Sequence, residues 1–170
     1  MSRRSKDNSL PAVALLPSDA KHSVEFFKRH VDDDPVQTAP GLSALMSFPS
    51  QVRVRMLATL FAVAAAPPKR FAGGGQWEAM HGEMSGYFEV RVDSSVSGQR
   101  MHYRLFCLLD INATEQDRPL LTVVDGASKK FRTKLPASRY AETRKLGDEY
   151  LSRNPRSLIT EDELQAALSV

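Results

Sequence analysis

YFEVRVDSSVSGQRMHYRLFCLLDINATEQDRPLLTVV, residues 87–124, is the stretch whose hydrophobic pattern decides the fold. Apolar residues recur at every second position in residues 87–92 and again in residues 101–109, the period of a strand with one buried face. A third apolar run, residues 120–124, follows a polar loop. Three strands joined by short links predict an antiparallel meander.

The same alternation divides the side chains between the two faces of the predicted sheet. Phe88, Val90 and Val92 point one way, and Cys107 lies on the apolar side of its strand, which indicates a small core residue rather than a nucleophile. The other face receives Glu89 and Arg91 from the first strand, and His102, Arg104 and Phe106 from the second.

Helical patterns flank the meander on both sides. Apolar spacing predicts a helix over residues 18–31, and a second helix that begins near Pro49 and ends before Pro67. Residues 32–46 read as a linker, and residues 73–75 as a glycine loop without the GxxxxGK[ST] phosphate-binding pattern. A third helix is expected from Pro136 to about Ser152. Thr160 and Glu163 match a capping box, which predicts a short terminal helix.

The expected fold is therefore α+β. N-terminal helices pack on one face of a small antiparallel sheet, a C-terminal helix follows, and the second face of the sheet is partly open. We expect residues 1–17 to be a flexible basic arm, with residues 12–16 a possible edge strand. Residues 18–156 form a single domain, and residues 157–170 form an acidic tail with the short helix.

Composition excludes several classes of protein. The chain has 170 residues, a one-domain length, and no apolar run approaches the roughly 18 residues of a membrane span. The basic start is followed by too few apolar residues for a secretory signal. A single cysteine rules out an internal disulfide and a cysteine-rich zinc site, so we expect a cytoplasmic protein with no metal and no cofactor.

Charge points to a polyanion as the partner. The net charge is only +3, but residues 127–156 hold nine Lys or Arg against three Asp or Glu. A basic block of this kind favours nucleic acid, and a solvated helix face without a ligand is the alternative.

The candidate site is the polar face of the meander. Arginine binds phosphate with two parallel hydrogen bonds and lysine binds it as a point charge, so this face predicts an anion-binding surface. An aromatic side chain there could stack a splayed RNA base, and Tyr87, Tyr103, Phe106 and Phe131 are candidates. The alternative is a set of exposed ion pairs of about 0–1 kcal/mol each. Trp77 reads as an anchoring core aromatic, and the loop residue His81 as a possible ligand or acid.

The order of these motifs resembles the RelE/ParE superfamily of bacterial type II toxins, in its HigB or phage Gp49-like branch. The resemblance covers about 100 residues, roughly 48–151. It rests on W-x-x-M-x-G at 77–82, [YF]-E-[LV]-R at 88–91, Y-R at 103–104, G-x-x-K-K at 126–130 and a helix begun by Pro136.

The resemblance implies cleavage of mRNA on the translating ribosome without a metal, and a cognate antitoxin, a helix-turn-helix protein, that blocks the toxin. A ribose 2′-OH would attack the adjacent phosphate, which needs a base, an acid and cations around the phosphorane. The implied catalytic residues are Glu89, Arg91, Arg104, Lys129 and Lys130. The implied RNA-binding residues are Lys69, Arg70, His81, His102, Phe131, Arg132 and Lys134.

Two other functions stay open at the level of sequence. One is a non-catalytic inhibitor that binds DNA gyrase, as in the ParE branch. The other is a non-toxic binding module whose only partner is a DNA-binding antitoxin. We also hypothesise that the acidic tail folds over the protein's own basic face.

Overall fold

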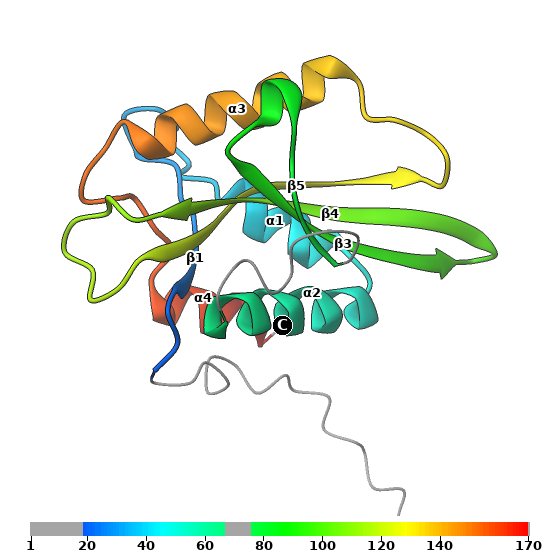
Figure 1. The fold of residues 1–170 in the computed structure, drawn as a ribbon, viewed down its shortest axis with the longest axis horizontal. Helices are drawn as coiled ribbons and strands as arrows, with labels where there is room; N and C mark the ends of the chain where they lie inside the picture. Colours follow the sequence, from blue (N-terminus) through cyan, green and yellow to red (C-terminus); the bar gives the residue numbers. More distant parts are fainter. Residues whose placement is uncertain (1–18, 67–75, 170) are drawn as a thin grey trace, which may run out of the picture.

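The structure, a computed structural model, describes residues 19–66 and 76–169. Within these residues the chain forms four α-helices, a short 3-10 helix and a five-stranded sheet, an α+β fold (Figure 1). The predicted arm, its possible edge strand at 12–16, the glycine loop at 73–75, Lys69 and Arg70 lie outside the described residues. The elements in chain order are β1 Ser23–Phe26, α1 Pro40–Ser47, α2 Ser50–Ala65, β2 Trp77–Ala79, η2 Gly82–Met84, β3 Tyr87–Val96, β4 Gln99–Asp110, β5 Leu120–Lys130, α3 Ala137–Leu151 and α4 Glu161–Leu168.

The predicted meander is confirmed as β3, β4 and β5, paired antiparallel. Its strands are longer than predicted, because the segment after Val92 continues as strand to a tight turn at Ser97 and Gly98. Both turn residues have positive φ, which suits the right-handed twist of a hairpin. The sheet order is β1-β5-β4-β3-β2, and β1 runs parallel to β5, so the sheet is mixed rather than purely antiparallel.

The helix predicted over residues 18–31 is wrong. Residues 23–26 form β1, which pairs with β5 from Ser23 opposite Leu120 to Phe26 opposite Val123. The spacing of Val24, Phe27 and Val31 is compatible with a helix, but Phe26 and Phe27 enter separate apolar clusters on the two faces of the sheet. Pairing with β5, about a hundred residues away, therefore determines the structure of this short segment, and local periodicity does not predict such a pairing.

The linker predicted over residues 32–46 is also partly wrong, because α1 begins at Pro40. Proline suits the first turn of a helix, where its missing N–H would be unpaired anyway. The helix lies very close to β5, since a Cβ built on Gly126 would come within 2.7 Å of the Ala44 side chain. A glycine in the strand therefore lets α1 seat directly on the sheet.

Helices cover the two faces of the sheet unequally (Figure 1). On one face α1, α2 and α4 enclose the main core, which contains Trp77, Val90 and Cys107. Trp77 is stacked on Phe88, and Cys107 is fully buried, as predicted. On the other face α3 packs, with Met84 of η2 in the same small apolar cluster, and the hairpin ends of β3 and β4 extend beyond α3 (Figure 1).

The acidic tail does not cover the basic face. The capping box at Thr160 is present, and α4 packs its Leu164, Ala167 and Leu168 side chains on the main core. That core lies on the face opposite to Glu89 and Arg104, so the hypothesis that the tail covers these charges is wrong. No helix in the described residues is long and apolar enough to cross a membrane.

Two sets of hydrogen-bonded polar side chains, here called the α3 clamps, hold α3 on its face of the sheet. At the start of the helix Arg139 donates to both carboxylate oxygens of Asp125, at 2.6 and 3.0 Å, and the Thr143 hydroxyl donates to the same carboxylate. At its end Tyr150 donates to Asp110 at 2.6 Å and Arg156 at 2.8 Å. These clamps determine how far α3 reaches across the sheet and therefore which part stays open.

Candidate functional site

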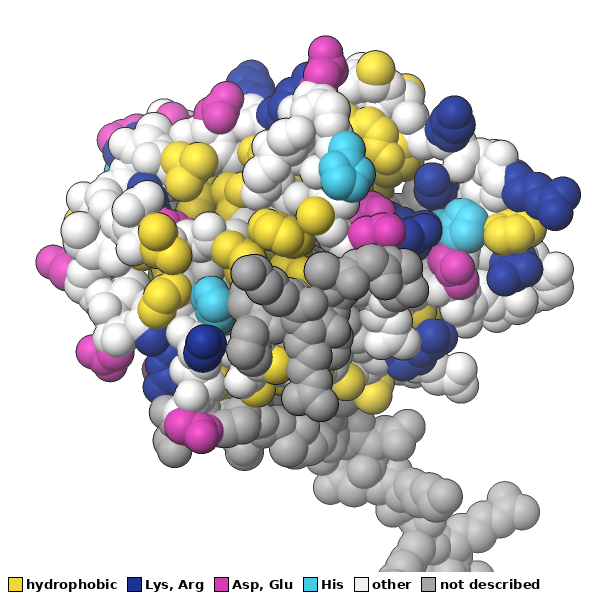
Figure 2. All heavy atoms as spheres, in the orientation of Figure 1, with side chains coloured by type: hydrophobic (Ala, Val, Ile, Leu, Met, Phe, Trp, Pro, Cys, Tyr) yellow, Lys and Arg dark blue, Asp and Glu magenta, His cyan; other side chains and the backbone are white. Residues whose placement is uncertain are grey.

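The open part of the sheet gathers charged residues from three neighbouring strands. Arg91 of β3 lies opposite Arg104 of β4, and Asp93 lies opposite His102, which in turn lies opposite Lys129 of β5. Acidic, basic and histidine side chains gather on this face beside one another (Figure 2). We call Glu89, Arg91, Asp93, His102, Arg104 and Lys129 the open cluster.

Arg104 is the centre of the open cluster. Its side chain is only 6% exposed, and its guanidinium lies between two carboxylates, 3.7 Å from Glu89 Oε2 and 3.4 Å from Asp93 Oδ1. The same guanidinium donates to the Tyr103 carbonyl at 2.9 Å, which fixes its orientation. A buried, oriented guanidinium with long contacts to its carboxylates can exchange them for the oxygens of a phosphate.

The negative charge of the partly buried Glu89 side chain is poorly compensated by its neighbours. It lies 3.6 Å from Arg91 Nε and 3.7 Å from Arg104 Nε, and both distances exceed that of a good hydrogen bond. Burial raises the pKa of Glu89 above that of an ordinary glutamate, although the two arginines act in the opposite direction. A carboxylate with a raised pKa is a better proton acceptor than a surface glutamate.

The pKa of Lys129 is shifted in the opposite direction to that of Glu89. Burial, followed by the positive charge of Arg104, lowers the pKa of the Lys129 ammonium, while Glu89 opposes that shift. An ammonium with a lowered pKa gives up its proton more readily. The open cluster thus pairs a strengthened base with a strengthened acid, around a fixed guanidinium.

His102 connects the open cluster to a basic aromatic edge. Its Nδ1 contacts Asp93 Oδ1, and its ring lies 5.1 Å from the Phe131 ring. The guanidinium of Arg100 lies 4.1 Å from the Phe131 ring centre and that of Arg132 lies 5.3 Å away. Such cation–aromatic arrangements suit stacking of nucleic-acid bases beside a phosphate chain.

Several predicted residues lie elsewhere. β5 continues through Lys130, and strand alternation places Lys130 opposite Met101, away from the face of Lys129. Lys134 is exposed in the loop after β5. Among the aromatic candidates for base stacking, Tyr87, Tyr103 and Phe106 are buried, so only Phe131 stays available.

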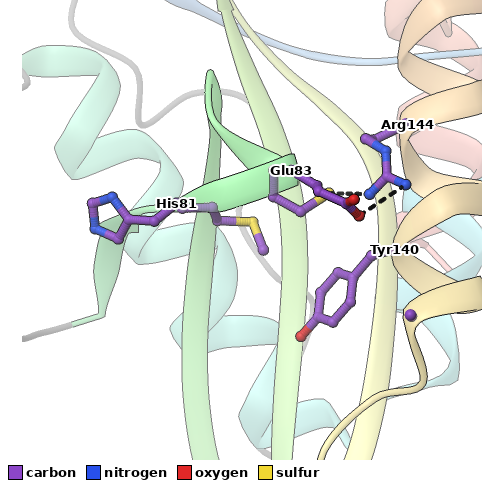
Figure 3. A pocket seen from close by; sticks show the side chains of 7 residues that line it. His81, Glu83, Tyr140 and Arg144 are labelled. Atoms are coloured by element: carbon purple, nitrogen blue, oxygen red, sulfur yellow. Dashed lines mark hydrogen bonds and ion pairs between the residues drawn. The ribbon is translucent and has the colours of Figure 1, made fainter.

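His81 lies apart from the open cluster. It lines a pocket between η2 and α3, together with Tyr140 and Arg144, and its ring points away from Tyr140 (Figure 3). The resemblance had grouped His81 with the RNA-binding residues. The structure places His81 beside α3 and not in the open cluster.

Sequence reasoning missed three residues around the open cluster. Asp93 extends the alternation of Glu89 and Arg91 by one step and was lost because the predicted strand stopped at Val92. Glu78, which forms an ion pair with Arg91, depends on the pairing of β2 with β3, which no local signal predicts. Tyr140 packs on Phe106 from α3, where burial, followed by the charge of Glu89, raises the pKa of its hydroxyl.

The arrangement can hold an anion and move protons around it. In the described parts of the chain, no group of three or more His, Cys, Asp or Glu residues is placed to hold a metal ion. Guanidinium and ammonium groups lie in one place with an aromatic edge beside them, an arrangement that can bind an anion such as a phosphate. No family model, no curated protein and no solved structure matches this chain.

Proposed function

We propose that this protein is an endoribonuclease that binds single-stranded RNA across the open cluster and cleaves it there. The observation that carries the proposal is the position of Glu89. Its pKa is raised by burial, and it lies between Arg91 and Arg104 on an otherwise open sheet face. The ion pairs of the α3 clamps are closer, at 2.6 Å between Arg139 and Asp125 and 2.8 Å between Arg156 and Asp110.

The residues of the open cluster have separate roles in the proposed reaction. Glu89 accepts the proton of a ribose 2′-OH, and the freed oxygen attacks the adjacent phosphorus. Arg104 and Arg91 neutralise the charge that develops on the phosphorane oxygens. The bond from phosphorus to the 5′-oxygen breaks, and Lys129 gives its proton to that oxygen. The products are a 2′,3′-cyclic phosphate and a 5′-hydroxyl end.

The biological setting that we propose is a RelE/ParE-like toxin of a type II toxin–antitoxin system. It is supported by the motifs quoted above, and by two helices that precede an antiparallel meander with a helix behind it. In this setting the substrate is mRNA on the ribosome, and a cognate antitoxin covers the toxin. The basic edge around Phe131 offers the surface for RNA.

The proposal is tested by cell-free translation with the purified full chain, followed by mapping of mRNA 5′ ends. Arg104→Lys keeps a positive charge but loses the two-pronged contact to phosphate, so cleavage should fall at least about tenfold. Lys145→Gln, an exposed change on α3, is the matched control and should cleave like the wild type.

The outcomes separate the alternatives. Cleavage that needs both ribosomes and Arg104 supports the proposal. Intact mRNA with inhibited DNA supercoiling would replace it with the gyrase inhibitor. Intact mRNA with normal translation would refute it in favour of a binding module.

A further inference from the structure

A pocket of about 330 Å³ lies between η2 and the first two turns of α3 (Figure 3). Its walls are largely apolar, because Met80 and Met84 enter from the η2 side and Tyr140 from α3. Met80 and Tyr140 pack against the smaller core cluster beneath α3, so these walls are anchored. A flat aromatic ligand fits between thioethers and a tyrosine ring.

The charged residues Arg144 and Glu83 lie at one side of the pocket, and His81 lies at the opposite side (Figure 3). Arg144 Nη2 is 3.6 Å from Glu83 Oε2, and Arg144 Nη1 is 3.8 Å from the Met84 sulfur (Figure 3). Glu83 is 84% exposed in its side chain, so the ion pair is open to solvent. The pocket therefore presents donors and an acceptor side by side that a ligand can engage.

The pocket borders the open cluster through Tyr140. The Tyr140 ring meets Phe106 edge to face at 5.9 Å, and Phe106 lies directly opposite Glu89 in the sheet register. The charges of Glu89 and Arg104 also act on the Tyr140 hydroxyl. A nucleotide whose phosphate contacts Arg104 would thus have its base next to this pocket.

We propose that the pocket binds one base of the RNA strand that lies on the open cluster, and that guanine is its best match. Met80, Met84 and Tyr140 contact the flat faces of the base. Arg144 donates to the O6 and N7 acceptors of guanine, and Glu83 accepts from its N1 and N2 donors. This inference rests on the proposed function and adds a determinant of sequence preference to it.

The test uses the full chain labelled with ¹³C at its methionine methyl groups. Guanosine 5′-monophosphate should shift the Met80 and Met84 resonances through the ring current of the bound base, while Met46, Met56 and Met101 stay unchanged. Ribose 5-phosphate, which lacks the base, should leave Met80 and Met84 in place. Cytidine 5′-monophosphate should bind more weakly than the guanosine nucleotide.

Variants on α3 provide the matched comparison. Arg144→Gln should weaken guanosine 5′-monophosphate about tenfold, because the contact to O6 and N7 is lost. Lys145→Gln, one residue further and exposed, should bind like the wild type. Unchanged Met46, Met56 and Met101 resonances show that each variant has kept its fold.

Failure of this inference is distinguishable from failure of the proposed function. Absence of Met80 and Met84 shifts at millimolar nucleotide, or equal binding by the two α3 variants, overturns the base pocket even if RNA is cleaved. Base-dependent shifts in a chain that cleaves no RNA would refute the endoribonuclease and support the pocket alone.

Discussion

The α3 clamps and the open cluster are built from the same residue types on the same face of one sheet. In the clamps, arginine and carboxylate meet at 2.6 Å between Arg139 and Asp125 and at 2.8 Å between Arg156 and Asp110. In the open cluster, the contacts of Arg104 to its carboxylates are 3.4 and 3.7 Å. The difference lies in how completely each charge is satisfied.

The pKa directions of Asp110 and Glu89 follow this difference, whereas the hydrogen bond from His102 holds the pKa of Asp93 below its usual range, as at Asp110. Hydrogen bonds from Arg156 and Tyr150 outweigh burial and hold the pKa of Asp110 below its usual range. At Glu89 burial outweighs the arginines, and the pKa is raised. The clamps therefore serve the fold, whereas the charge of Glu89 is incompletely compensated, which under the proposed function makes it the proton acceptor.

The largest expected effect is on catalysis. Glu89→Gln keeps the shape of the side chain but removes the proton acceptor, so RNA cleavage should fall about 10²–10⁴-fold. The free energy of unfolding at neutral pH should not fall, because the variant no longer buries a poorly compensated charge. Rates come from single-turnover cleavage, and stability from urea denaturation. A fully active variant would remove Glu89 from the reaction.

The second effect is on stability, and it compares equivalent changes in the two regions. Asp110→Asn leaves the Arg156 side chain, only 5% exposed, without its charge partner, and should lower the free energy of unfolding by about 3–5 kcal/mol. Asp93→Asn removes a carboxylate whose side chain is 43% exposed and leaves the buried Arg104 paired with Glu89, so it should cost less than about 1 kcal/mol.

Urea denaturation of both variants measures this contrast. Equal losses of stability would show that the open cluster is also a structural clamp. The comparison between the two regions would then lose its basis, and the long distances around Arg104 would carry no functional meaning.

The pH dependence of stability should have opposite signs at Glu89 and at Asp110. The raised pKa of Glu89 means that its contribution is present at low pH and is lost as pH rises through the folded-state pKa. The lowered pKa of Asp110 means that its contribution is present above about pH 3.9 and is lost as pH falls further.

Comparison of the wild type with Glu89→Gln from pH 4 to pH 8 isolates the contribution of Glu89 to the pH dependence of stability. The variant should gain stability relative to the wild type as pH rises, by at most about 1.4 kcal/mol per pH unit. Denaturation curves at each pH provide the measurement. A relative loss on raising the pH would mean that the folded state favours the ionised carboxylate.

The meander and the face of each of its side chains could be predicted from sequence, because strand alternation has a period of two and Val90, Leu105 and Cys107 mark the buried face. The helix α2 and the capping box at Thr160 were predictable for the same reason, as local signals. β1 and β2, the strand that carries Glu78, could not be predicted, since each depends on pairing with a strand elsewhere in the chain.

Most of the candidate site could be predicted for a similar reason. Glu89, Arg91, His102 and Arg104 followed from alternation alone, whereas Tyr140 comes from a helix packed across the sheet. The contrast between Arg104 and the clamp arginines was invisible in the sequence, because each is an Arg beside Asp or Glu. The distances to their carboxylates distinguish them.

The smallest expected effect concerns the margin of the open cluster. Arg132 lies at the Phe131 ring beyond the end of β5 and contributes no ion pair to the clamps. If RNA runs from Arg104 to this edge, Arg132→Ala removes one phosphate contact. RNA affinity should then fall about threefold to tenfold, and the slope of log K against log salt should become shallower by about 0.7.

Lys21→Ala removes the same charge from an exposed position beside the Leu120 end of β5, opposite to the end that Arg132 follows, and it separates local contact from overall charge. Screening at physiological salt limits a charge to about 8 Å, so a distant lysine should leave the slope unchanged. Titrations of a non-cleavable 2′-deoxy-substituted oligonucleotide across a salt series measure both slopes. A slope change of equal size in the two variants would mean that RNA senses net charge alone, and the path from the open cluster to Phe131 would be wrong.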